Sequence, residues 1–285
     1  MTAPSQRKVG EAPVSQAQQE SIQLERLERA VAMVQTWAPR AQALELPEPG
    51  SAMAADDLVY PPHPASTITW FALTSALDHL DLGAQILQAD DVTVRRPHAF
   101  YSLTRSALLA AAQCTWVLCG TDDERAVRSL LVAEDEAKHH RSFLKSYLDD
   151  PLFVADSGAA IVGQMHDHAE HLTARISQLR AHCRERGINT RFESTTMIKN
   201  VARYIAPDDP TLRQAILDQW IRGSAAAHAR MWRIHFTGGE DTPLQGGGLH
   251  RKVTSSIEDI TTAYVTPVLV LREAISLWDV LGARP

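Results

Sequence analysis

An arginine and a histidine separated by five residues could together move protons at a phosphate ester. Arg222 and His228 have this spacing, and Gly223 and the alanines Ala225 to Ala227 lie between them. Histidine titrates near neutral pH and can take or deliver a proton, while arginine stabilises the extra negative charge of a phosphorane. The pair therefore predicts proton transfer at a phosphodiester, a reaction for which we expect no cofactor.

The spacing alone is weak evidence for a site. Arginine followed by histidine after four to six residues occurs three times in the chain: Arg175 with His182, Arg222 with His228, and Arg230 with His235. That is about the number expected by chance from the composition. Six residues also turn a helix through about 600°, which leaves the two side chains about 120° apart. Arg222 would have to meet His228 of a second copy, which predicts a homodimer.

The segment from Asp209 to Phe236 must position the pair, and it has the clearest helix start in the sequence. Asp209 can cap free backbone amides, and Pro210 suits the first helical position. A helix through Phe236 would place on one face Ser224, His228, Met231, Trp232 and His235. The small residues after Arg222 would let another helix lie very close, from this chain or from a second copy. The structural alternative is a helix–helix contact in which Arg222 pairs with Asp218 one turn earlier.

The apolar segment from His98 to Cys119 contains a further arginine, Arg105. A helix that is apolar on nearly every side belongs at the centre of a bundle. We expect Arg105 to contribute to ligand binding, as we do for Ser224, Arg230 and Trp232. The alternative for a lone arginine in such a helix is a structural pair with a buried acid.

The Arg222–His228 spacing within a small-residue helix of an all-helical chain resembles the HEPN superfamily. The resemblance implies a metal-independent endoribonuclease of a toxin–antitoxin or phage-defence system, with Arg222 and His228 as its catalytic pair at a dimer interface. It also implies RNA as a ligand and an antitoxin or another neighbouring-gene product as a partner. Residues 66–285 are also similar to uncharacterised actinobacterial helical proteins. Gly223 and Leu109 depart from the patterns, which have a polar residue and often a glutamate there.

A cluster of histidines and carboxylates is the second candidate for chemistry. Two predicted helices flank a turn near Phe153, and antiparallel pairing would bring together Glu136, His139, His140, His168 and His171. Imidazole and carboxylate ligands from facing helices suit zinc, iron or manganese. The chain lacks the second Glu-x-x-His and the further glutamates of carboxylate-bridged metal bundles. The alternative is a solvated or pH-sensitive face.

Composition and periodicity predict an all-α fold, an antiparallel helical bundle with peripheral helices. The chain has 285 residues, of which 45% are hydrophobic, and a net charge of −6 without a basic stripe. That charge argues against binding dominated by broad phosphate neutralisation. No segment shows the period-two pattern of strands. We expect a disordered tail (1–15), an N-terminal helix with a Pro-rich arm (16–65) and a HEPN-like bundle (66–285).

Several sequence features bound the location and the local structure. The longest apolar run, Ser106 to Cys119, is too short to span a bilayer, which predicts a cytoplasmic protein without membrane association. Three cysteines without a Cys-x-x-Cys pair predict buried thiols. The glycines between 238 and 248 predict a flexible loop, and Pro267 predicts a kink or break in the last helix.

Three functions follow from these patterns. The first is a metal-independent ribonuclease or RNA-binding protein of a stress or defence system. The second is a non-catalytic helical interaction module, in which the small-residue helix is a docking face. The third is a metal-binding bundle that uses the hairpin between residues 122 and 187.

Overall fold

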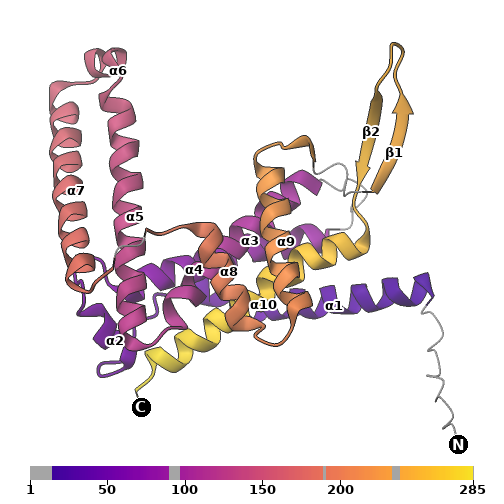
Figure 1. The fold of residues 1–285 in the computed structure, drawn as a ribbon, viewed down its shortest axis with the longest axis horizontal. Coiled ribbons are helices and arrows are strands. Elements are labelled where there is room, and N and C mark those ends of the chain that lie inside the picture. Colours follow the sequence, from indigo (N-terminus) through magenta and orange to yellow (C-terminus); the bar gives the residue numbers. More distant parts are fainter. Residues whose placement is uncertain (1–14, 90–96, 189–190, 233–237, 285) are drawn as a thin grey trace, which may run out of the picture.

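The computed structural model describes residues 15–89, 97–188, 191–232 and 238–284. The described chain is almost entirely helical, which confirms the predicted all-α class (Figure 1). The predicted disordered tail, residues 1–15, lies outside the described residues except for Ser15. The Ser15 hydroxyl accepts a hydrogen bond from the backbone N–H of Gln18 at 3.3 Å and so caps the first helix.

Three long helices form the centre of the bundle. They are α3 (Ala65–Gln88), α4 (Pro97–Leu118) and α10 (Ile257–Gly282), and α4 packs against both of the others. The Tyr264 hydroxyl of α10 donates to the Leu80 carbonyl of α3 at 2.8 Å, so this buried phenol is satisfied. The apolar composition of α4 thus places it at the centre, as the sequence predicts.

The N-terminal region shares this core. Helix α1 (Gln16–Trp37) packs against α10 and α3, and Val34 is fully buried. The Pro-rich arm is not featureless, because it contains the 3-10 helix η1 (Ala38–Gln42) and the short helix α2 (Ala52–Asp57). Met53 of α2 is also fully buried. Residues 16–65 therefore belong to the same hydrophobic core as the rest of the bundle.

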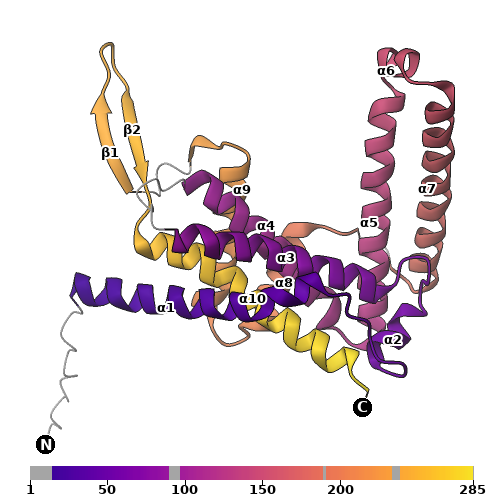
Figure 2. The same ribbon diagram turned by 180° about the vertical axis from the view of Figure 1, so that it is seen from behind.

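A long helical hairpin projects from the bundle and carries a short helix at its distal end (Figures 1 and 2). It consists of α5 (Asp122–Leu148), α6 (Pro151–Asp156) and α7 (Ala159–Glu185). Thr121 and Glu124 have the Thr-x-x-Glu spacing of a capping box, and they form one at the start of α5. The two long helices pair along their length, as predicted, but α6 replaces a simple turn at the tip.

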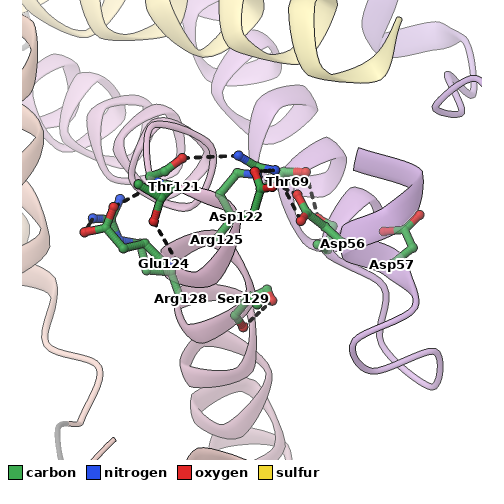
Figure 3. A network of polar contacts seen from close by, with 12 residues as sticks. Asp56, Asp57, Thr69, Thr121, Asp122, Glu124, Arg125, Arg128 and Ser129 are labelled. Carbon is green, nitrogen blue, oxygen red and sulfur yellow. Dashed lines mark hydrogen bonds and ion pairs between the residues drawn. The ribbon is translucent and has the colours of Figure 1, made fainter. Parts of the chain in front are cut away.

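A buried ion pair joins the base of this hairpin to the bundle. The Arg125 guanidinium of α5 contacts the Asp56 carboxylate of α2 at 2.6 Å and the Asp122 carboxylate at 2.8 Å (Figure 3). The Asp56 and Arg125 side chains are 7% and 5% exposed. A buried charge whose partner is removed is strongly destabilising, so this contact fixes where the hairpin leaves the body.

Two further helices cover α4. They are α8 (Ser194–Ile205) and α9 (Pro210–Ala227), which pack against each other and against α4. The Asp209 carboxylate accepts the Leu212 N–H at 2.9 Å, which confirms the predicted helix start.

The predicted continuation of this helix to Phe236 is wrong, because α9 ends at Ala227. The Arg230 N–H donates to the Ala225 carbonyl at 2.8 Å, and the Ala229 N–H donates to the Ala226 carbonyl at 3.2 Å. These two bonds form a Schellman motif, in which the residue after the cap adopts a left-handed conformation. Ala229 does so, with φ of 50°, and this turns the chain out of the helix.

The region around the C-terminal glycines corrects a second prediction. Residues 238–254 form an antiparallel hairpin of β1 (Gly238–Pro243) and β2 (Leu249–Thr254) rather than a loose loop. Gly246, Gly247 and Gly248 at its tip all have positive φ, which only glycine adopts readily. The strand signal is weak in the sequence because β1 is built from glycine and polar residues.

The last helix, α10, runs as one element through Pro267, so the predicted break at this proline is wrong, while the predicted kink stays a prediction. Within the described ranges α10 is also the single helix long and apolar enough to cross a membrane, and 56% of its most apolar window is buried inside the protein. Such burial is typical of a core helix of a soluble protein. The cytoplasmic location stays a prediction.

The cysteines lie as expected for structural thiols. All three are free, with Cys114 and Cys183 buried and Cys119 half-buried. Burial raises the pKa of each thiol. A raised pKa disfavours the reactive thiolate, so none of them has the properties of a nucleophile.

Candidate functional site

The small-residue face of α9 is occupied by α4 of the same chain. A Cβ at Gly223 would lie 2.5 Å from the Arg105 Cβ and 3.1 Å from the Tyr101 carbonyl oxygen. Ala225 and Ala226 beside it are buried. The prediction that another helix fills this face is therefore confirmed, and the helix that fills it is internal.

Arg105 lies at the centre of the α4–α9 contact. Its Nε donates to the Ser224 Oγ at 2.8 Å, and its guanidinium carbon lies 4.3 Å from the centroid of the Trp220 ring. Beside it, the Gln219 amide nitrogen donates to the Thr104 hydroxyl at 2.9 Å. The structure thus brings together two of the predicted binding residues, Arg105 and Ser224.

The charge of Arg105 is stabilised by an aromatic ring and a hydroxyl group. Within the described ranges no carboxylate pairs with it, so the expected buried acid is not the partner. Burial lowers the pKa of Arg105. The Trp220 face attracts the cation, and the contact holds α4 to α9.

Arg222 faces two carboxylates on the side of α9 near α10. Its Nε lies 2.7 Å from Asp218 one turn earlier, and its Nη1 lies 3.4 Å from Asp259. Asp259 in turn accepts from Ser256 in the capping box of α10. Arg222 therefore ties α9 to the first turn of α10, which is the structural role that the sequence left open as an alternative.

His228 lies at the exposed end of α9, away from these contacts. It is the C-cap residue, and Arg230 and Trp232 after it are also exposed. No hydrogen bond or ion pair joins His228 to Arg222 in the part of the chain that is described. The predicted continuous face fails because the helix ends before His228. His235 lies outside the described residues.

The predicted metal ligands of the α5–α7 hairpin are only partly brought together. The His140 and His168 rings lie 4.8 Å apart, and the His168 and His171 rings lie 6.4 Å apart. His139 is 80% exposed and faces Asp135 at 3.4 Å. Among the described residues, no three histidine, cysteine, aspartate or glutamate side chains are placed to hold a metal ion.

This geometry has a simple cause in the helix period. A spacing of three or four residues puts Glu136 and His139 on one face of α5, but that face is the solvated side of the hairpin. Apolar residues take the facing positions, namely Ala137, Leu144, Leu172 and Ile176. The predicted metal ligands thus lie on the solvent-exposed side of the two helices. Metal binding stays a prediction, because the described residues form no preformed metal site.

The distal end of the hairpin is a feature that the sequence interpretation missed. The exposed fractions are 80% for Leu152, 57% for Phe143, 55% for Ile161 and 40% for Tyr147. The sequence signal for this feature is the apolar run Leu152 to Val154 after Pro151, where the sequence analysis expects only a turn. We call Phe143, Tyr147, Leu152 and Ile161 the tip surface. They are the large apolar side chains that the described hairpin exposes.

Compared with known proteins, the chain matches no family model, no curated protein and no solved structure. The HEPN resemblance stays a prediction from the sequence.

Proposed function

We propose that the protein is a helical interaction module that binds a protein partner through the tip surface of the α5–α7 hairpin. The observation that carries the proposal is the exposure of four large apolar side chains near the distal end of the α5–α7 hairpin. Figure 1 shows that this hairpin projects from the bundle. Of these four, Phe143 and Tyr147 are in direct ring contact, and grouped exposed apolar side chains are typical of binding sites in soluble proteins. The body also exposes single large apolar side chains, such as Leu44, Phe71 and Val280, but the tip surface has four of them near the distal end of one projecting hairpin.

Aromatic packing holds the tip surface in a defined shape. The Phe143 and Tyr147 rings meet edge to face at 5.2 Å, and the Tyr147 and Phe153 rings do so at 5.1 Å. The Asp150 carboxylate accepts the backbone N–H groups of Leu152 and Phe153, which caps α6. A surface ordered before binding loses less conformational entropy when a partner arrives.

Ion pairs between the two long helices support the arm. The buried Glu134 carboxylate lies 2.7 Å from Arg180 of α7 and 2.8 Å from Lys138 of α5. Burial works against ionisation, but the hydrogen bonds from these two cations hold the pKa of Glu134 below its usual range. The arm is therefore fixed both to the bundle and across its own two helices.

The charge of the tip indicates what kind of surface it binds. Arg141 and Lys145 lie beside Phe143 on α5, but between Lys145 and His166, where Tyr147, Leu152 and Ile161 lie, the chain has three aspartates, Asp149, Asp150 and Asp156, and no basic residue. All three are exposed. Apolar side chains bordered by carboxylates complement a protein surface on which apolar residues are bordered by lysine or arginine. We therefore commit to a partner of that chemistry.

Site-specific photocrosslinking tests this function. A photoreactive residue at position 152, expressed in the native host, should capture one protein whose cross-linked peptide contains apolar residues next to lysine or arginine. The same residue at position 44 is the matched control, because Leu44 is 77% exposed and lies outside the α5–α7 hairpin. Cross-links only to a second copy of the chain would replace the partner with self-association. Equal products at both positions would contradict the proposal.

A second candidate is the metal-independent cleavage of RNA by two copies of the chain. It is favoured by the exposure of His228, which leaves its imidazole accessible at the end of α9. Cleavage would require Arg222 to leave Asp218 and Asp259 and approach a second copy. His228→Ala should then abolish EDTA-resistant cleavage that leaves a 2′,3′-cyclic phosphate, with an unchanged melting temperature. Wild-type protein that is inert on varied single-stranded RNAs would remove this candidate.

A further inference from the structure

Two basic side chains of α7 meet an aromatic ring at the base of the hairpin. The Arg175 guanidinium carbon lies 5.8 Å from the centroid of the Tyr60 ring, and the His182 ring meets the same ring nearly edge-on at 5.9 Å. Arg175 and His182 are two helical turns apart, which places them on the same face of α7. They are also one of the three arginine–histidine pairs found in the sequence, and the structure gives this pair a common neighbour.

Arg175 has a donor that nothing in the described chain satisfies. Its Nε is buried and has no hydrogen-bond acceptor. By contrast, Arg105 donates its Nε to Ser224, and Arg125 donates its Nε to Asp56. A buried donor without an acceptor is destabilising, and such groups are rare in folded proteins unless water, an ion or a ligand meets them.

A second histidine reaches the same place from another element. The His63 backbone N–H donates to the Tyr60 carbonyl at 3.0 Å, so a tight turn before α3 carries both side chains. The pKa of His63 is lowered by burial and by the positive charge of Arg175.

The acids near this cluster leave its donors available. The Glu185 carboxylate lies 3.6 Å from the Nδ1 of His182 and is largely exposed, so the Nε2 of that ring is not engaged by it. Within the described ranges, no carboxylate forms an ion pair with Arg175 or with His63. The cluster therefore presents one guanidinium, two imidazoles and a phenol with an excess of positive charge.

We propose that Arg175, His63 and His182 form a binding site for a phosphate-class oxyanion. A guanidinium donates two parallel hydrogen bonds to the oxygens of such an anion, and each imidazole adds an N–H donor. A tetrahedral phosphate has enough oxygens to accept from all three side chains. The anion would also supply the acceptor that the buried Nε of Arg175 lacks. This site is separate from the tip surface, and it lies where the hairpin joins the body.

Inorganic phosphate is the first probe, with the full chain in a phosphate-free buffer. Phosphate should raise the melting temperature by a few degrees relative to sodium chloride at the same ionic strength, because a ligand that binds only the folded state stabilises it. Arg175→Gln should lose this increment. Arg184→Gln is the matched control on the same helix, because Arg184 is exposed and its substitution changes the charge equally; it should keep the increment.

An NMR titration of the wild-type protein keeps the test valid if Arg175→Gln does not fold. Phosphate should shift the imidazole resonances of His63 and His182 at saturating concentrations and leave those of His79, on α3, unchanged. Glycerol phosphate and dimethyl phosphate as further ligands separate a monoester from a diester. Equal stabilisation of Arg175→Gln and wild type, or uniform histidine shifts that chloride reproduces, would overturn the proposal.

Discussion

The α4–α9 contact and the tip of the α5–α7 hairpin differ in the size and the burial of their side chains. In the contact, small residues bring two backbones together, and each polar side chain at the centre has a partner. At the tip, large apolar side chains extend from the helices into solvent. The small-residue pattern that attracts attention in the sequence is explained by packing alone. The surface that we propose as a binding site is instead the one with large exposed residues.

The two regions also differ in what their charges do. Arg222 at the contact is held by Asp218 and Asp259, so its charge is used to join two helices. The aspartates Asp149 and Asp156 near the tip form no ion pair within the described chain. Paired charges stabilise a fold, and unpaired charges around an apolar surface can select a partner.

The largest difference in stability should be between two glycine-to-alanine variants, at Gly223 and at Gly163, which should change the free energy of unfolding in opposite directions. Gly223→Ala should lower the free energy of unfolding by about 1 to 3 kcal/mol, because its Cβ would overlap Arg105. Gly163→Ala on α7 should raise it by about 0.5 to 1 kcal/mol, because that position is open and alanine favours the helix. Chemical denaturation of both variants measures the difference. Two variants of equal stability would show that the contact is loose.

Loss of the charge on Glu134 should destabilise the pairing of α5 with α7 and leave the α4–α9 contact folded. Glu134→Gln should lower the free energy of unfolding by about 1 to 3 kcal/mol, as expected for a charged hydrogen-bonded group. The control is Glu136→Gln on the exposed face of the same helix, which should change stability by less than about 0.5 kcal/mol.

The pH dependence of this effect has a definite sign. Because the pKa of Glu134 is lower in the folded than in the unfolded chain, its contribution is complete above the ordinary value of 4.5 and is lost as pH falls through the folded value. The stability difference between wild type and Glu134→Gln should therefore shrink below pH 4.5. A difference that stays constant down to pH 3 would contradict the ion-pair role.

The end of α9 offers a smaller effect of the opposite sign. Ala229→Gly should raise the free energy of unfolding by up to about 1 kcal/mol, because glycine adopts the left-handed conformation at lower cost than alanine. Ala227→Gly, one position inside the helix, is the control and should lower stability by about as much. Thermal unfolding of the pair checks the helix end directly. A loss of stability in Ala229→Gly would mean that the helix continues.

The sequence predicts the helical framework well because its signals are local. Caps at Asp209 and Thr121 and the apolar composition of α4 each act within a few residues, and the structure has these features as predicted. The C-terminal end of α9 could not be located in the same way. Its Schellman motif places an alanine where a glycine is usual, so the common stop signal is missing.

The candidate site was harder to predict because it depends on contacts between distant segments. The sequence could name Arg105 and Ser224 but could not show that they meet across 119 positions. It placed His139 and Glu136 together by helix period, yet the period does not say which face is turned outward. Leu152 is exposed because α6 lies at the distal end of the hairpin, away from the helices of the bundle.

The affinity of the cross-linked partner for tip variants tests the central claim most directly. Leu152→Asp should weaken binding by about 30-fold or more, as expected for a central apolar contact worth about 2 kcal/mol. The melting temperature of the Leu152→Asp variant should stay close to that of the wild type, because a surface substitution usually changes stability by no more than about 0.5 kcal/mol. Leu44→Asp should leave both binding and stability unchanged. Wild-type affinity in Leu152→Asp, or a loss of affinity that follows unfolding, would contradict the assignment of the tip as the binding surface.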